Sequence, residues 1–259
     1  MRVCRRAVNF PAELIRSLHD VSKLAILTGA GVSQESGLRT FRDAHPSTPS
    51  AGQAGLWAQY KPEDLASPQA FARDPKLIWD WYAWRREAIK GVRPNAGHYA
   101  LVEIEKRIPH FTLITQNVDG LHRMAGNQSV LELHGNIQRV RCSECYLFTE
   151  TWGDDADSVP QCSSCGGLLR PDVVWFGESL PREQLEAAVE AARTCDIFFS
   201  IGTSGVVQPA ASLALAAHNR SAVVVEINAE ATPLTPKADY FIQGKSGEIL
   251  PELVKTVWG

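Results

Sequence analysis

Two cysteine pairs in the middle of the chain restrict its fold more than any other feature. Cys142 and Cys145 form one C-x-x-C pair, and Cys162 and Cys165 form a second. Each pair presents two thiolates to one ion, and two pairs complete the tetrahedral set that zinc prefers. This spacing is typical of a zinc ribbon. Because an all-cysteine site leaves no position for a reacting water, we expect the zinc to be structural and the chemistry to lie elsewhere.

The composition is that of a globular protein, and it excludes several classes. The chain has 259 residues, of which 44% are hydrophobic and 21% charged, enough for one large core or for a core with a small satellite. A net charge of -3 argues against nucleic-acid or anionic-membrane partners, which favour basic surfaces. No apolar run reaches the length of a membrane span, and no secretory signal is expected. Since no disulfide is needed, we expect a cytoplasmic protein.

Short apolar runs predict the strands of a parallel sheet, namely residues 23–28, 111–115, 196–201 and 222–227. A helix is expected over residues 11–22, and helical stretches separate the strands. This alternation predicts an α/β fold, with a Rossmann-type parallel sheet covered by helices on both faces. Each strand ends in polar or glycine residues. Because ligands of such sheets bind at the carboxyl ends of the strands, we expect these ends to contact a cofactor.

Two segments interrupt the alternation. Residues 43–55 are rich in Pro, Ser, Gly and Ala, which predicts a mobile loop. Residues 138–170 hold the cysteines and predict a small inserted zinc-binding domain. The remainder, 1–137 and 171–259, is expected to form the Rossmann-type domain, with a helical insert at about 43–95.

A glycine-rich turn follows the first predicted strand. Gly29, Ala30 and Gly31 lead into a helix that is expected to start near Ser33. Strand, glycine-rich turn and helix open a dinucleotide-binding unit, in which glycine lets the backbone approach a pyrophosphate. The third glycine of that motif is missing, and many tight turns use two glycines, so both interpretations remain open.

Polar residues also follow the second strand. The run Thr115-Gln-Asn-Val-Asp119 could hold a ribose and a carboxamide, or form an Asx-type turn that caps the next helix. His134 follows a further apolar segment. Its imidazole titrates near neutral pH and can act as a general base, although a histidine in this position is commonly structural.

Two more segments carry alternative interpretations. Tyr82 and Arg85 lie three residues apart in a Trp-rich run, so on a helix they share a face. They could bind one carboxylate together, or the helix could simply pack its aromatic side with arginines in solvent. The apolar run Val173–Glu178 is most simply a core strand, or else an edge that pairs with an extended peptide.

In order along the chain, these motifs resemble the sirtuin family of NAD-dependent protein lysine deacylases. The resembling segments are Gly29–Ser33, Glu35–Gly37, Thr40–Arg42, Thr115–Asp119, Leu133–Gly135, the four cysteines, Leu169–Glu178, Gly202–Ser204 and Asn228–Glu230. Tyr82 with Arg85 further resembles class III sirtuins, which remove acidic acyl groups such as succinyl, malonyl and glutaryl. The form of residues 37–42 is similar to that of bacterial members.

The resemblance implies an NAD-binding domain, a zinc domain, and a cleft between them where acyl-lysine and NAD meet. In the implied mechanism the acyl oxygen displaces nicotinamide from its ribose. His134 then activates a ribose hydroxyl, and lysine and O-acyl-ADP-ribose are released. Asn117 and Asp119 match the other catalytic positions. The implied partners are acyl-lysine proteins and NAD, with no nucleic acid or membrane, and we expect a monomer.

The resemblance also implies the binding residues. Those for NAD are Gly29, Ala30, Gly31, Glu35, Thr40, Phe41, Arg42, Gln116, Asn117, Asp119, Gly202, Thr203, Ser204, Asn228, Ala229, Glu230 and Ser246. Those for the substrate are Tyr82, Arg85, Val173, Trp175, Phe176 and Gly177. Zinc would be held by Cys142, Cys145, Cys162 and Cys165 and would stabilise the small domain.

The sequence departs from the family pattern at two places, and two other functions have to be considered. Arg39 stands where the family often has proline, and residues 43–55 resemble an insertion in the cofactor loop. The alternative function is a mono-ADP-ribosyltransferase that uses the same NAD site. A non-catalytic NAD-sensing or zinc-ribbon module is disfavoured, because a pure binder would not need the base His134.

Overall fold

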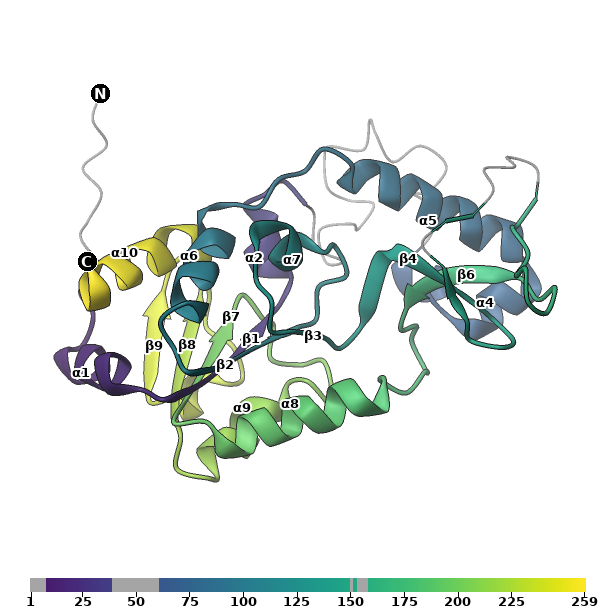
Figure 1. The fold of residues 1–259 in the computed structure, drawn as a ribbon. Coiled ribbons are helices and arrows are strands. Elements are labelled where there is room, and N and C mark those ends of the chain that lie inside the picture. The colour runs from purple at the N-terminus through teal and green to yellow at the C-terminus, as the bar shows by residue number, and fades with distance from the viewer. Residues whose placement is uncertain (1–7, 39–60, 150, 153–157) are drawn as a thin grey trace.

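A six-stranded parallel sheet forms the core of the larger lobe (Figure 1). The computed structural model describes residues 8–38, 61–149, 151–152 and 158–259. The strands are β1 (Lys23–Thr28), β2 (His110–Thr115), β3 (Val130–Glu132), β7 (Ile197–Ile201), β8 (Val223–Asn228) and β9 (Tyr240–Gln243). Their order, β3-β2-β1-β7-β8-β9, is that of a Rossmann fold, so the predicted fold class is confirmed. The edge strand β9 was not predicted.

Helices cover both faces of this sheet, because side chains of successive strand residues point to opposite faces. Leu24 and Ile26 face α1, α6 and α10, whereas Ala25 and Leu27 face α8 and α9. Figure 1 shows these two groups of helices on opposite sides of the strands. The helices of this lobe are α1 (Ala12–Asp20), α2 (Ala30–Gln34), α6 (Ala96–Glu105), α7 (Leu121–Ala125), α8 (Arg182–Thr194), α9 (Ser212–His218) and α10 (Ser246–Trp258).

A second sheet forms the smaller lobe. It is antiparallel, in the order β5-β4-β6, and consists of β4 (Gly135–Cys142), β5 (Phe148–Thr149) and β6 (Leu169–Val173). The helices α3 (Pro62–Leu65), α4 (Pro68–Arg73) and α5 (Pro75–Ile89) pack against it through a separate apolar cluster that contains Tyr82, Ile137 and Trp175. The division into domains stays a prediction.

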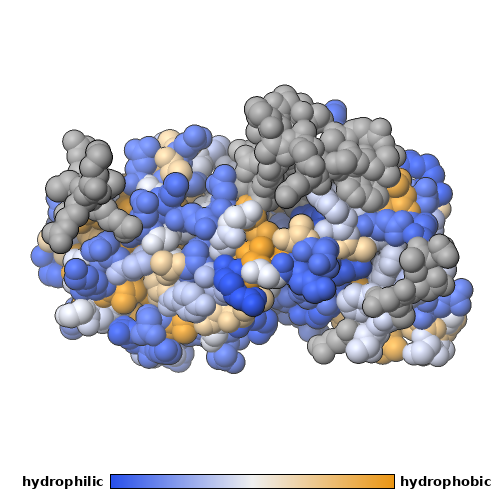
Figure 2. Space-filling model, turned by 90° about the horizontal axis from the view of Figure 1, so that it is seen from above, coloured by the Kyte–Doolittle hydropathy of each residue, from blue (hydrophilic) through white to orange (hydrophobic). Residues whose placement is uncertain are grey.

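Apolar side chains gather in the middle of the face that Figure 2 shows, where the two lobes meet. Strongly hydrophilic residues lie on both sides of this apolar area. Among the described residues, none of the helices combines the length and the apolar character that crossing a bilayer requires.

Candidate functional site

The loops that follow β1 and β7 touch at the point where the strand order reverses. The Gly29 N–H donates to Ile201 O at 3.0 Å, and the Gly31 N–H donates to Gly202 O at 2.9 Å. A Cβ atom added to Gly31 would lie 2.9 Å from Gly202 Cα, and Gly202 itself has a φ of +60°. These glycines are therefore needed for the contact between the two loops. Helix α2 begins at Ala30, earlier than the predicted start near Ser33.

A chain of hydrogen bonds joins this turn to the end of β2. The Asn117 amide Nδ2 donates to Gly29 O and to Ser33 Oγ, both at 3.0 Å. The Ser33 hydroxyl donates to Asp119 Oδ2 at 2.7 Å. The other Asp119 oxygen accepts the Leu121 N–H at 2.9 Å, so this carboxylate also forms the Asx-type turn of the alternative interpretation, although the N-cap residue of α7 is Gly120. Burial raises the pKa of Asp119, although the bonds from Leu121 and Ser33 oppose the rise.

His134 lies in the turn between β3 and β4, beside the same strand end. Its Nδ1 is 3.0 Å from the carbonyl oxygen of Gln116. Because a carbonyl only accepts, Nδ1 carries the proton and Nε2 keeps its lone pair. Burial lowers the pKa of His134, and the hydrogen bond to Gln116 opposes that shift. The imidazole is therefore neutral at pH 7 and can accept a proton at Nε2.

The ends of β7 and β8 supply further polar groups to this edge of the sheet. The Asn228 amide donates to Thr203 O at 2.6 Å, and the Thr203 and Ser200 hydroxyls are 3.0 Å apart. The side-chain oxygen Oδ1 of Asn228 accepts the N–H of Ala229 at 3.0 Å. Thr203 is buried, whereas Ala229 and Glu230 are exposed. With Gly202 and Ser204, these residues lie at the carboxyl ends of two adjacent strands.

Two of the residues predicted to contact the cofactor bind each other. The Glu35 carboxylate accepts the hydroxyl of Ser246 at 2.9 Å and the N–H of Gly247 at 2.8 Å, at the start of α10. A carboxylate at a helix N-terminus satisfies free N–H groups and complements the helix dipole. In this structure Glu35 therefore fastens α2 to α10.

The donors at this edge suit a dinucleotide. Amides, hydroxyls and a carboxylate converge at the switch point of a parallel sheet, where nucleotides bind in such folds. Asn117, Asp119, Asn228 and Thr203 would hold its polar groups, while His134 stands next to them.

The four cysteines meet in the smaller lobe. Their sulfur atoms all lie within 4.8 Å of one another, with Cys142 and Cys165 at 3.4 Å and Cys145 and Cys162 at 3.7 Å. Tetrahedral zinc with bonds of about 2.3 Å places its sulfurs about 3.8 Å apart, so the cluster fits one zinc ion. The N–H groups of Glu144 and Cys145 point at Cys142 Sγ, which favours its thiolate.

The comparisons with known proteins agree with this arrangement. A model described as the Sir2 family matches residues 29–209, well over half of the chain. This chain belongs to the Sir2 family. NAD-dependent protein deacylase 2 of Pyrobaculum aerophilum is 53% identical over 232 residues, which cover 90% of each chain.

Solved structures extend the likeness to the whole fold. A crystal structure of a Sir2 homologue in complex with NAD superimposes with a TM-score of 0.87 at 45% identity, covering 97% of this chain and 95% of that one. A Sir2 protein bound to an acetylated peptide gives a TM-score of 0.81 at 27% identity, covering 94% and 96%.

In this Sir2 protein Tyr82 and Arg85 lie together on α5, as predicted. The Arg85 guanidinium carbon is 5.8 Å from the centre of the Tyr82 ring and 5.0 Å from that of Trp81. The Tyr82 hydroxyl accepts the indole N–H of Trp175 at 2.9 Å. Burial raises the pKa of Tyr82, opposed by Arg85, and burial lowers the pKa of Arg85, opposed by Tyr82.

The segment Val173–Glu178 is not a core strand, so that interpretation is wrong. Strand β6 ends at Val173, and the chain then turns because the Glu178 carboxylate accepts the N–H of Trp175 at 2.8 Å. Trp175 is buried, Phe176 is 52% exposed, and Gly177 has a φ of +89°. Whether this segment pairs with a substrate peptide stays a prediction.

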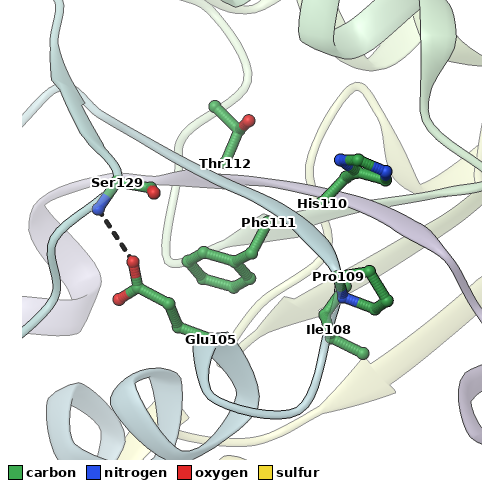
Figure 3. A pocket seen from close by; sticks show the side chains of 7 residues that line it. All are labelled: Glu105, Ile108, Pro109, His110, Phe111, Thr112 and Ser129. Atoms are coloured by element: carbon green, nitrogen blue, oxygen red, sulfur yellow. Dashed lines mark hydrogen bonds between the residues drawn. The ribbon is translucent and has the colours of Figure 1, made fainter.

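A hollow of about 330 Å³ lies at the opposite end of the strands, between the C-terminus of α6 and the start of β2. Figure 3 shows the Glu105 carboxylate reaching Ser129, whose N–H it accepts at 2.8 Å. It also accepts the Gln128 N–H and the Asn127 amide, so its oxygens are already used by the protein. The hollow is therefore not part of the site.

Three predicted residues, Thr40, Phe41 and Arg42, lie outside the described residues. Conversely, Ser33 was missing from the predicted site, although its hydroxyl joins Asn117 to Asp119. Two signals in the sequence could have identified it, namely its place in the first turn after the glycines and its inclusion in the segment Gly29–Ser33 that resembles the family.

Proposed function

We propose that this chain, an NAD-dependent protein deacylase, removes succinyl and malonyl groups as well as acetyl groups from lysine side chains. Its products are free lysine, nicotinamide and O-acyl-ADP-ribose. The observation that carries the acyl preference is the pair on α5 formed by the buried Tyr82 and the partly buried Arg85, on the lobe opposite the nucleotide edge.

His134 supplies the proton acceptor of the proposed reaction. NAD, as co-substrate, provides a ribose carbon from which nicotinamide can leave. The Gln116 carbonyl orients the imidazole so that Nε2 faces away from it with a free lone pair. A base of this kind takes the proton of a ribose hydroxyl, and a neutral histidine is suited to do so near pH 7.

Asn117 and Asp119 hold the nicotinamide end in this proposal. Ser33 links their side chains, so the amide and the carboxylate are fixed relative to the β1 turn before any ligand binds. Such preorganisation lowers the cost of placing the leaving group next to the base.

Arg85 is proposed to bind the carboxylate of an acidic acyl group. Its guanidinium lies beside the Trp81 and Tyr82 rings, which restricts its rotamers and keeps water from its faces. A desolvated guanidinium binds a carboxylate through two parallel hydrogen bonds, and Tyr82 lies close enough to share that carboxylate.

The test compares one lysine peptide in acetyl and succinyl forms by NAD-dependent nicotinamide release. We expect Arg85→Met to lower kcat/KM for the succinyl peptide about tenfold to a hundredfold, as for a lost charged hydrogen bond. The acetyl peptide should be nearly unaffected. Equal losses for both peptides would remove Arg85 from acyl selection and leave it a packing residue.

A further inference from the structure

Two buried carboxylates and the partly buried guanidinium of Arg139 join the two sheets next to the turn that carries His134. Glu132, the last residue of β3, accepts the Arg139 Nη1 at 2.8 Å and the Asn136 amide at 2.8 Å. The same Arg139 donates from Nε and Nη2 to Asp172 Oδ2, both at 3.0 Å. Glu132 belongs to the large sheet, whereas Arg139 and Asp172 belong to the small one. One guanidinium therefore bridges the two lobes.

The backbone around Arg139 is a bulge, which explains where this side chain points. Asn136 pairs with Asp172 and Val140 pairs with Pro171, so Ile137, Gln138 and Arg139 are left without partners on β6. A bulge redirects side chains, and bulges are common beside active sites. Here it turns Arg139 back toward the end of β3.

The same bulge holds the segment that carries the nucleotide-binding side chains. The Ile137 N–H donates to Val118 O at 2.8 Å, between Asn117 and Asp119 in the chain. On the other side, the His134 carbonyl accepts the N–H of Val174 at 2.9 Å. The turn that carries His134 is therefore tied to the large lobe by the Ile137–Val118 bond and to the small lobe by the His134–Val174 bond. The direction of the His134 ring consequently depends on how the two lobes are joined.

We propose that Arg139 is a positioning residue for the His134 step, because it fixes the β3–β4 turn by joining Glu132 to Asp172. This role rests on the proposed function. The role can be tested because the two steps of the proposed reaction need different groups. Release of nicotinamide needs the NAD and acyl-lysine sites but not the base, whereas the later step needs His134. Loss of Arg139 should therefore slow the later step and leave the release of nicotinamide unchanged.

The charges explain why, among the residues that the structure describes, none replaces Arg139. The Glu132 and Asp172 side chains are only 8% and 10% exposed, so their carboxylates depend on a cation within the protein. Arg123 is 3.6 Å from Glu132 and donates to Val130 O, and both of these partners belong to β3 of the large lobe. The Asn136 amide of β4 also bonds Glu132, but it is neutral, so Arg139 is the cation among these contacts that joins the two sheets.

The experiment measures two rates with NAD and an acetyl-lysine peptide. One is the exchange of radiolabelled nicotinamide into NAD, and the other is peptide turnover. We expect Arg139→Gln to lower turnover at least about tenfold while exchange and the KM for NAD stay within about twofold. Arg139→Lys should regain part of the turnover, because an ammonium keeps the charge but not the planar fork.

Two further variants guard against a trivial loss of folding. Asp172→Asn removes one partner with little change in shape, and it should show the same separation with a smaller amplitude. Arg107→Gln is the matched control. Its side chain is 34% exposed, as is that of Arg139, and it bonds Glu103 on α6 far from the turn. This control should leave both rates unchanged.

A second readout does not depend on activity. In protein with nitrogen-labelled histidine, the Nδ1–H bonded to Gln116 should give a protected NMR signal that Arg139→Gln weakens or loses. Equal losses of exchange and turnover, or no change in turnover and in this signal, would overturn the role of Arg139. Absence of nicotinamide release by the wild type would refute the proposed function instead, and the NMR signal would still decide the role of Arg139.

Discussion

At the scale of single residues, the chemistry of this protein depends on how backbone atoms orient side chains. The Gln116 carbonyl decides which nitrogen of His134 carries the proton, and burial keeps the ring neutral. Neither the carbonyl nor the burial changes the nature of the imidazole. Together they turn an ordinary histidine into a base that faces the nucleotide edge with a free lone pair.

The first residue-scale prediction concerns pH. His134 acts as a base only when it is neutral, so kcat/KM should fall as the pH drops through its pKa. Because burial lowers that pKa, the fall should lie below the ordinary value of about 6.5, with a plateau at neutral pH. A pH–rate profile with the acetyl peptide measures it. A fall centred above pH 7 would contradict the assignment of His134 as the base.

The substitution His134→Tyr should abolish peptide turnover at every pH, while the variant keeps its zinc.

Spacings along the chain could be read from the sequence, whereas the contacts that side chains make across the chain could not. The cysteine pairs and Tyr82 with Arg85 depend on spacings of three residues, which the sequence displays directly. The bonds of Ser33 to Asn117 and Asp119, and of Arg139 to Glu132, depend on strand register and on a bulge. No local pattern reveals such long-range contacts.

At the scale of elements, apolar runs predicted the strands well, except where a side chain takes a backbone N–H group that a strand would use. Strand β1 has the predicted bounds, and β2 begins only one residue earlier than predicted. The run after Val173 is as apolar as a strand. It bends because the Glu178 carboxylate takes the N–H of Trp175 and pairs with Arg170. A competing acceptor three residues away thus overrode β propensity.

Helix α5 offers an element-scale prediction, because it carries the proposed acyl-selecting pair. Asp74 caps it by accepting the Leu77 N–H at 3.0 Å, and Pro75 follows at the first helical position. Asp74→Ala should lower the free energy of unfolding by about 1 kcal/mol, which denaturant titration measures. Asp80→Ala is the control, since it removes an equal charge and only the exposed pair with Lys76. Equal effects of the two substitutions would show that the cap contributes nothing.

At the scale of the whole molecule, each lobe has its own apolar core. The parallel sheet is packed by two clusters, one on each face, and both are formed by the helices of the large lobe. In the small lobe Trp79, Val140 and Leu169 pack directly around Cys142 and Cys162. A zinc ion at the four cysteines would therefore stabilise the surface against which α5 packs, as well as the loops that carry the cysteines.

Removal of zinc should consequently loosen one lobe and spare the other. Binding of a structural metal ion contributes to the free energy of folding, so its removal destabilises the part of the protein that packs around it. Here that part is β4, β6 and the side of α5 that carries Trp79. We expect a chelator to abolish deacylation and to lower hydrogen-exchange protection in β4, β6 and α5. Protection should persist in β1, β7 and β8, whose packing involves none of the four cysteines. Exchange measured by mass spectrometry with and without chelator tests this. Loss of protection in both lobes alike would mean that the large sheet depends on the zinc lobe for its stability, contrary to the separation of their cores.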